Sequence, residues 1–242
     1  IIENLGIKQK LYTRIEEFRK AGSLITSNTS GIPIEMLLEG RSDDFKQSFC
    51  GTHFFNPPRY LKLLEIIPST HTSQEVIGFL TEFGEKHLGK KVVVCKDTPA
   101  FIANRIGVYS MMSVFHLMKE FDLSVEETDK LTGPIIGRPK SATFRTCDVV
   151  GLDTLVLVAQ NLKKALAHDE AKDVFEIPDF IQKLMENQWL GAKTGQGFYK
   201  KIKSEEGISE ILSLNLSNFE YQRKQQKKFE ELYAAKANTH LK

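Results

Sequence analysis

The sequence has few of the features that mark secreted, metal-binding or membrane proteins. Its 242 residues include three cysteines, an odd number with no metal-site spacing. Cys50 and Cys95 lie inside apolar runs typical of strands, where a buried free thiol is the expected state. No apolar run approaches the roughly 20 residues that a helix needs to span a bilayer. We therefore predict a reducing, cytoplasmic compartment, no bound metal and no membrane span.

An excess of charge of one sign is also missing. The formal net charge is +2, from 33 Lys and Arg against 31 Asp and Glu, which is too small to favour nucleic acid or an anionic membrane surface as a partner. Hydrophobic residues make up 41% and charged residues 26% of the chain, as in an ordinary soluble globular protein. The length allows one large domain or two small ones.

No Gly-x-Gly-x-x-Gly motif follows a strand-like run anywhere in the sequence. This motif places the pyrophosphate of a dinucleotide against a helix N-terminus. The sequence also opens without an initiator Met or a targeting signal, and residues 1–4 (Ile-Ile-Glu-Asn) are typical of the last residues of a strand. We expect a fragment that begins inside a strand and has no pyrophosphate-binding loop.

The N-terminal part of the chain alternates helical and strand-like patterns. Apolar residues recur at helical spacing over residues 4–20 and 73–87, and a short helix or turn fits 32–38. Short apolar runs typical of strands lie between them, at residues 23–27, 49–55, 61–67 and 91–95. This alternation is typical of βαβ units, so we predict an α/β fold with a mostly parallel sheet.

The pattern changes after residues 97–99 (Asp-Thr-Pro). Thr98 can cap a helix that begins at Pro99, and the spacing stays helical to about residue 190. We therefore predict an α/β domain over 1–97, an all-α domain over 98–200, and a basic segment over 201–242 that is a linker or the start of a further module. Within that segment, residues 211–215 and 219–221 fit a small hairpin.

His53 is a candidate catalytic base. It ends an apolar run, and Asn56 and two prolines follow, which stiffen the turn and fix the directions of both polar side chains. An alcohol that loses a hydride must also lose its hydroxyl proton, and a His that titrates near neutrality is a natural acceptor. The alternative is a core His that a carbonyl group satisfies at the strand end.

Glu65 lies among Leu and Ile residues, where a bare charge is costly, so it must be paired or exposed. If residues 53–65 form a strand, a turn and a return strand, then His53 and Glu65 face each other. The carboxylate can then fix the imidazole tautomer and stabilise the imidazolium. An edge-strand Glu in solvent is the alternative.

Three further polar residues lie where ligand contacts are common. Asn28 and Ser30 follow the 23–27 run at a βα turn, where open α/β sheets bind ligands, although the same residues could cap the next helix. Asn104 lies in the second turn of the predicted Pro99 helix. There it can reach a site between the domains or lie on the surface.

Five segments of the sequence share their order and composition with a known family. They are 27–31 (Ser-Asn-Thr-Ser-Gly), 51–58 (Gly-Thr-His-Phe-Phe-Asn-Pro-Pro), 63–67 (Leu-Leu-Glu-Ile-Ile), 95–105 (Cys-Lys-Asp-Thr-Pro-Ala-Phe-Ile-Ala-Asn-Arg) and 193–199 (Lys-Thr-Gly-Gln-Gly-Phe-Tyr). Together they resemble the L-3-hydroxyacyl-CoA dehydrogenase family of fatty-acid β-oxidation, over residues 1–200. Residues 137–153 resemble its branch of large multifunctional proteins.

The resemblance implies the C-terminal part of a Rossmann-type NAD-binding domain, followed by the family's helical C-terminal domain. Family members carry the missing Gly-rich unit further upstream. By resemblance, the catalytic residues are His53, Glu65, Ser30, Asn56 and Asn104, and the residues that contact the cofactor, NAD, are Glu3, Lys8 and Asn28.

The function that the resemblance implies is NAD-dependent oxidation of L-3-hydroxyacyl-CoA to 3-oxoacyl-CoA. We expect this activity from the full-length protein and none from the fragment alone. The expected partners are an acyl-CoA substrate and a second copy of the chain, bound through the helical domain. Two alternatives remain: a non-catalytic module for acyl-CoA binding and dimerisation, and a sugar-acid dehydrogenase on the same scaffold.

Overall fold

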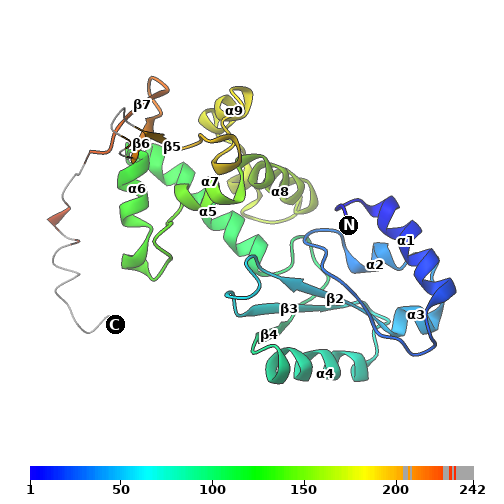
Figure 1. The fold of residues 1–242 in the computed structure, drawn as a ribbon. Helices are drawn as coiled ribbons and strands as arrows, with labels where there is room; N and C mark the ends of the chain where they lie inside the picture. The colour runs from blue at the N-terminus through cyan, green and yellow to red at the C-terminus, as the bar shows by residue number, and fades with distance from the viewer. Residues whose placement is uncertain (204–206, 208, 226–228, 231, 233–242) are drawn as a thin grey trace. The chain divides into compact units, whose positions relative to one another are not determined.

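The computed structural model describes residues 1–203, 207, 209–225, 229, 230 and 232. The chain forms two compact units, Ile1–Gly107 and Val108–Lys242 (Figure 1). The division falls inside helix α5 (Ala103–Glu120), later than the predicted boundary near residue 97. The first turn of α5 belongs to the first unit because its backbone is hydrogen-bonded to Glu65 of the sheet.

The first unit is built on a four-stranded sheet. Its strands are β1 (Ile25–Ser27), β2 (Phe49–Phe54), β3 (Leu63–Pro68) and β4 (Lys91–Val94), in the spatial order β1-β2-β3-β4. β1 and β2 are parallel and so are β3 and β4, but β2 and β3 are antiparallel. The four predicted strands are therefore confirmed. The antiparallel pair of β2 and β3 corresponds to the predicted strand and return strand.

Helices cover both faces of this sheet, which explains why its strands are almost continuously apolar. The helices are α1 (Leu5–Phe18), α2 (Ile34–Leu37), α3 (Asp43–Gln47) and α4 (Gln74–Glu82), and a π-helical turn, Phe83–His87, extends α4. On one face, Tyr12 of α1 packs with Phe45 of α3 and Phe49 of β2. On the other, Leu80 of α4 packs with Cys50, the next residue of β2. Neighbouring residues of β2 thus point to opposite cores.

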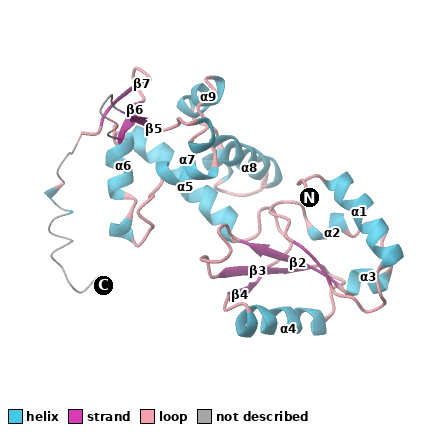
Figure 2. Cartoon of the chain, viewed as in Figure 1, coloured by secondary structure: helices cyan, strands magenta, loops and turns pink. Residues whose placement is uncertain are grey.

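The second unit is mainly helical (Figure 2). Besides the rest of α5 it contains α6 (Val125–Leu131), α7 (Phe144–Val150), α8 (Leu152–Ala165) and α9 (Asp179–Glu186). Short 3-10 turns at Pro134–Ile136 and Lys172–Phe175 connect α6 to α7 and α8 to α9, and a third at Ala192–Thr194 follows α9. Phe115, Phe144 and Phe198 form the aromatic centre of its core, with ring centroids of the last two 4.4 Å apart.

Helix α5 begins at Ala103, so the predicted start at Pro99 is wrong. Ala100 and Phe101 have positive φ angles of 59° and 54°, in the left-handed region, which an α-helix cannot include. Thr98 does not cap the helix. Instead, its carbonyl accepts a hydrogen bond from the Phe101 N–H in a turn that precedes α5.

Residues 209–223, part of the segment that was expected to be a linker or a further module, belong to the second unit and form a sheet with residues 199–203. β5 (Tyr199–Lys203), β6 (Ser209–Asn215) and β7 (Glu220–Arg223) are antiparallel neighbours in that order. The predicted hairpin is therefore confirmed as β6 and β7. Leu214 of β6 is buried and its N–H donates to the Phe198 carbonyl, so the hairpin packs on the helical unit.

A buried carboxylate holds the chain where α9 leads into β5. Asp148 of α7 accepts hydrogen bonds from the N–H groups of Phe198 and Tyr199, both at 2.9 Å. Burial raises the pKa of Asp148 to about 6 against the lowering effect of these bonds. Gly197 makes the approach possible, because a Cβ there would lie 2.7 Å from the Gly191 Cα and against the Asp148 carboxylate.

Among the residues that the structure describes, no helix is both long enough and apolar enough to cross a membrane.

Candidate active site

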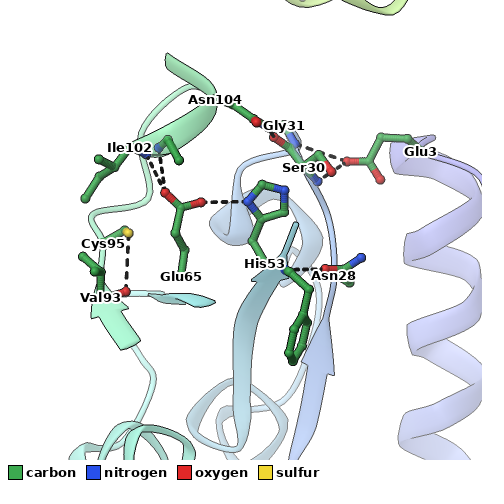
Figure 3. A network of polar contacts seen from close by, with 12 residues as sticks. Glu3, Asn28, Ser30, Gly31, His53, Glu65, Val93, Cys95, Ile102 and Asn104 are labelled. Atoms are coloured by element: carbon green, nitrogen blue, oxygen red, sulfur yellow. Dashed lines mark hydrogen bonds and ion pairs between the residues drawn. The ribbon is translucent and has the colours of Figure 1, made fainter. Parts of the chain in front are cut away.

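The pairing of β2 with β3 puts His53 directly opposite Glu65. His53 Nδ1 lies 2.7 Å from Glu65 Oε2, and the two residues are only 3% and 1% exposed (Figure 3). The predicted strand, turn and return strand, and the contact that they imply, are confirmed. The solvent-exposed alternative for Glu65 is wrong, because this carboxylate is buried and paired.

The second oxygen of Glu65 binds the start of α5. Oε1 accepts hydrogen bonds from the N–H groups of Ile102, at 3.1 Å, and Ala103, at 2.8 Å. Burial raises the pKa of Glu65, but the bonds from His53 and from these backbone groups outweigh it, so its net pKa is lowered. Glu65 is thus an ionised acceptor that caps α5 and aligns with the positive end of its dipole.

An ionised Glu65 determines which nitrogen of His53 carries the proton. Nδ1 must donate to the carboxylate, so neutral His53 is protonated at Nδ1 and Nε2 has a free lone pair. Figure 3 shows Nε2 on the side of the ring away from Glu65, where the loop of Ser30 lies. The geometry therefore equips His53 to accept a proton at Nε2.

Two aromatic rings enclose His53. The ring of Phe55 lies edge-on at a centroid distance of 4.5 Å, and that of Phe101 at 5.7 Å. Phe101 reaches this position from the turn with positive φ that precedes α5. Neither ring was assigned a role from the sequence, although both belong to segments that carry the family resemblance. They limit access of water to the imidazole.

A second carboxylate fixes the loop that follows β1. Oε1 of Glu3 accepts hydrogen bonds from the Thr29 hydroxyl and from the N–H groups of Ser30, at 2.9 Å, and Gly31, at 3.3 Å. Oε2 of Glu3 pairs with the buried ammonium of Lys8 at 2.5 Å. Burial raises the pKa of Glu3. The bonds from Lys8, Thr29 and the backbone have a larger, opposite effect, so the net pKa is lowered.

The structure brings most of the predicted site residues together. Asn28 Oδ1 accepts the Phe54 N–H at 2.9 Å, which ties the end of β1 to the end of β2 beside His53. Asn104, in the first turn of α5, donates from Nδ2 to the Ser30 carbonyl at 3.4 Å. The side chains of Asn28 and Ser30 are exposed. Asn56 follows β2 with an exposed side chain and, among the described residues, forms no hydrogen bond to this group.

Asp97 is a supporting residue that had no assigned role in the sequence analysis. Its two carboxylate oxygens accept the N–H groups of Ile34, at 2.8 Å, and Glu35, at 2.9 Å. It thereby joins the segment after β4 to the start of α2, directly after the Ser30 loop. The signal available in the sequence was an Asp between a strand and a proline, a position where carboxylates commonly satisfy backbone donors.

The pKa of Glu65 is expected to rise when His53 is replaced by Phe, because burial then acts without the opposing bond and charge of the imidazole. The measurement is a carboxyl carbon NMR titration of the 242-residue chain and of His53→Phe. Glu82, which pairs with Lys86 on an exposed helix turn, is the internal control and should titrate identically in both. An unchanged Glu65 pKa would contradict the pairing.

The lowered pKa of Glu65 in this pair also makes the stability of the fold depend on pH. A carboxylate whose pKa is lowered by folding stabilises the protein above its unfolded pKa and loses that contribution as the pH falls through the folded pKa. Wild type should therefore lose more unfolding free energy than His53→Phe on acidification below the ordinary Glu range. This difference can be followed by urea unfolding at a series of pH values.

Two family models match the chain. "3-Hydroxyacyl-CoA dehydrogenase, NAD binding domain" matches residues 1–98, and "3-hydroxyacyl-CoA dehydrogenase, C-terminal domain" matches residues 101–201. A probable 3-hydroxyacyl-CoA dehydrogenase of Bacillus subtilis (strain 168) is 56% identical over 83% of this chain and 25% of the relative. One of Deinococcus radiodurans is 46% identical over 85% and 58%. A putative fatty acid oxidation complex trifunctional enzyme of Rickettsia felis is 36% identical over 89% and 30%.

Solved structures agree. A 3-hydroxybutyryl-CoA dehydrogenase from Escherichia coli K12 matches with a TM-score of 0.74 and 26% identity, over 87% of this chain and 48% of that one. An (S)-3-hydroxybutyryl-CoA dehydrogenase from Ralstonia eutropha matches with a TM-score of 0.72 and 30% identity, over 81% and 66%. The chain thus spans only part of the proteins it matches. Two consecutive family models and relatives of the same name show that it belongs to the 3-hydroxyacyl-CoA dehydrogenase family.

Proposed function

We propose that the protein containing this chain oxidises L-3-hydroxyacyl-CoA to 3-oxoacyl-CoA with NAD, in fatty-acid β-oxidation. The observation that carries the proposal is the buried pair of His53 and Glu65, in which an ionised carboxylate leaves Nε2 of the imidazole free to accept a proton. The name of the Rickettsia felis relative supports the placement in fatty-acid oxidation.

In this mechanism the 3-hydroxyl proton of the substrate passes to Nε2 of His53. Glu65 stabilises the resulting imidazolium through Nδ1, and its bonds to Ile102 and Ala103 keep it in place. Phe55 and Phe101 exclude water from the imidazole. The hydroxyl of Ser30, on the loop that Glu3 fixes, holds the substrate oxygen, and Asn104 keeps that loop beside α5.

The residues present fit a nicotinamide cofactor at the carboxyl end of β1. Polar, exposed Asn28 and Ser30 follow this strand, which is parallel to β2, and open α/β sheets bind nucleotides at such strand ends. When bound, NAD supplies the hydride acceptor. Glu3, whose side chain is 42% exposed, and Asn28 would contact it, whereas Lys8 is 3% exposed and would act by holding Glu3.

The test is an assay of the whole protein with NAD, in which NADH formation is followed with matched L- and D-3-hydroxyacyl-CoA. Turnover of the L-isomer with much slower turnover of the D-isomer is expected. Absence of turnover with both would favour a non-catalytic acyl-CoA module. Oxidation of sugar acids in preference to acyl-CoA would favour the third interpretation. Asn56, which lies outside the contacts described, can be ranked with Ser30 and Asn104 by alanine substitution in the same assay.

The location and assembly of the protein complete the proposal. We infer a cytoplasmic location from the three buried cysteines, all present as free thiols. We also infer a homodimer through the helical unit, where apolar side chains are exposed at Tyr109, Val149 and Leu157. Light scattering of the 27.5 kDa chain should then give twice the monomer mass, and the monomer mass at micromolar concentration would rule the dimer out.

A further inference from the structure

We propose that the second unit has a binding site for a phosphorylated sugar, such as the ribose phosphate of a nucleotide. The site is a cavity of about 540 Å³, here called the basic pocket, whose walls come from α6, the 3-10 turn that follows it, Lys140, α7, β5 and, after β7, from Lys224, Gln225 and Leu232. It has no residue in common with the His53 site. Its cationic lining residues are Lys130, Lys140, Arg145 and Lys224.

Three of these cations have side-chain N–H groups that a ligand can use. Among the described residues, Lys140, Arg145 and Lys224 form no ion pair with a carboxylate, so a ligand can use their N–H groups without breaking a salt bridge. The ammonium of Lys224 lies over the ring of Tyr199, 4.4 Å from its centroid. Burial and the nearby charge of Arg145 lower the pKa of Lys224. A phosphate between the two cations would relieve this repulsion.

Two of the three lining carboxylates point their oxygens elsewhere. Asp129 accepts the N–H groups of Thr143, Phe144 and Arg145 and the hydroxyl of Tyr199. Glu127 completes the capping box of α6 with Ser124. Both carboxylates are therefore engaged by protein donors, and the three cations named above supply most of the polar groups that remain for a ligand.

The third carboxylate supplies the argument for a sugar. Glu126 accepts the Gln225 N–H with Oε1, but its Oε2 is buried without a hydrogen-bond partner. A buried carboxylate oxygen is costly unless a donor reaches it. A bare phosphate offers few donors, whereas a sugar phosphate offers hydroxyl groups beside its anionic group. Cations for the phosphate and one orphan acceptor for a hydroxyl thus match a phosphorylated sugar.

The test is isothermal titration of the 242-residue chain with ribose 5-phosphate, inorganic phosphate and ribose at low salt. Ribose 5-phosphate should bind more tightly than either part alone. The variant Lys140→Ala with Arg145→Ala should weaken it by about tenfold or more, since charge-assisted hydrogen bonds are lost. Added salt should weaken binding as well, because it screens the exposed cations.

Two further variants test whether binding depends on the residues of the basic pocket. Lys164→Ala with Lys201→Ala removes the same charge from exposed positions outside the basic pocket and should leave the affinity nearly unchanged. Glu126→Ala should reduce the preference for ribose 5-phosphate over inorganic phosphate. Equal affinity for ribose 5-phosphate and inorganic phosphate, or equal losses in the two double variants, would overturn the proposal. If ribose 5-phosphate binds, titrations with AMP and CoA then distinguish the source of the sugar phosphate.

Discussion

Replacing His53 by Gln in the whole protein is expected to lower kcat by about 10²–10⁴-fold with little change in KM, the usual effect of losing a positioned general base. Gln can fill the space and donate to Glu65, but it cannot take up the hydroxyl proton. The loss should fall on kcat because the proton moves only in the chemical step. The measurement is steady-state oxidation of an L-3-hydroxyacyl-CoA with NAD.

His71→Gln is the matched control, because His71 is exposed on a loop of the same unit. It should leave both constants near their wild-type values. Glu65→Gln should lower kcat as well, since a neutral amide stabilises the imidazolium poorly and its one oxygen can serve either His53 or the start of α5, not both. Circular dichroism separates this effect from misfolding. Near-normal kcat in folded His53→Gln would refute the assignment of the base.

Gly197→Ala is expected to destabilise the second unit by about 3 kcal/mol or more, toward the upper end for a single overpacking substitution. The added Cβ would meet the Gly191 Cα at 2.7 Å and the Asp148 carboxylate that binds the Phe198 N–H. Gly191 and Asp148 are both buried and hydrogen-bonded, so neither can move away without breaking hydrogen bonds. Urea or thermal unfolding of the 242-residue chain measures the loss.

Gly78→Ala is the control for this substitution. Gly78 lies in the middle of α4, and a Cβ there would meet no heavy atom within 4 Å. Removal of a helical glycine should raise stability by about 0.5–1 kcal/mol through propensity alone. If Gly197→Ala were no more destabilising than Gly78→Ala, the close approach at Asp148 would be wrong.

The sequence predicts the contact between His53 and Glu65 well because the information is local. Two apolar runs separated by a proline-containing turn indicate a hairpin, and the alternation of side chains in strands then places His53 across from Glu65. The same periodicity locates β1 to β4 and the helices α1, α2 and α4, but it does not predict α3. Hydrophobic patterns carry this information, since buried faces require apolar residues at fixed intervals.

The contacts that complete the site are not encoded locally. Glu3 reaches the loop of Ser30 across the fold, and Glu65 caps a helix far along the chain. The start of α5 at Ala103 was missed because Thr98 and Pro99 form an ordinary helix-start pattern. Positive φ angles at Ala100 and Phe101, stabilised by packing, override that pattern. Tertiary contacts decide such cases, and spacing alone cannot reveal them.

Within the part of the chain that the structure describes, the polar contacts around His53 come from residues 3–104, whereas the contacts around Asp148 belong to the second unit. Cooperative opening in proteins commonly follows such compact units. Substitutions that disturb the packing at Gly197 and substitutions of His53 should therefore have separate effects on the same chain. Loss of His53 should remove the imidazole while the chain stays folded, and a packing defect at Gly197 should melt the helices of the second unit while His53 keeps its contact with Glu65.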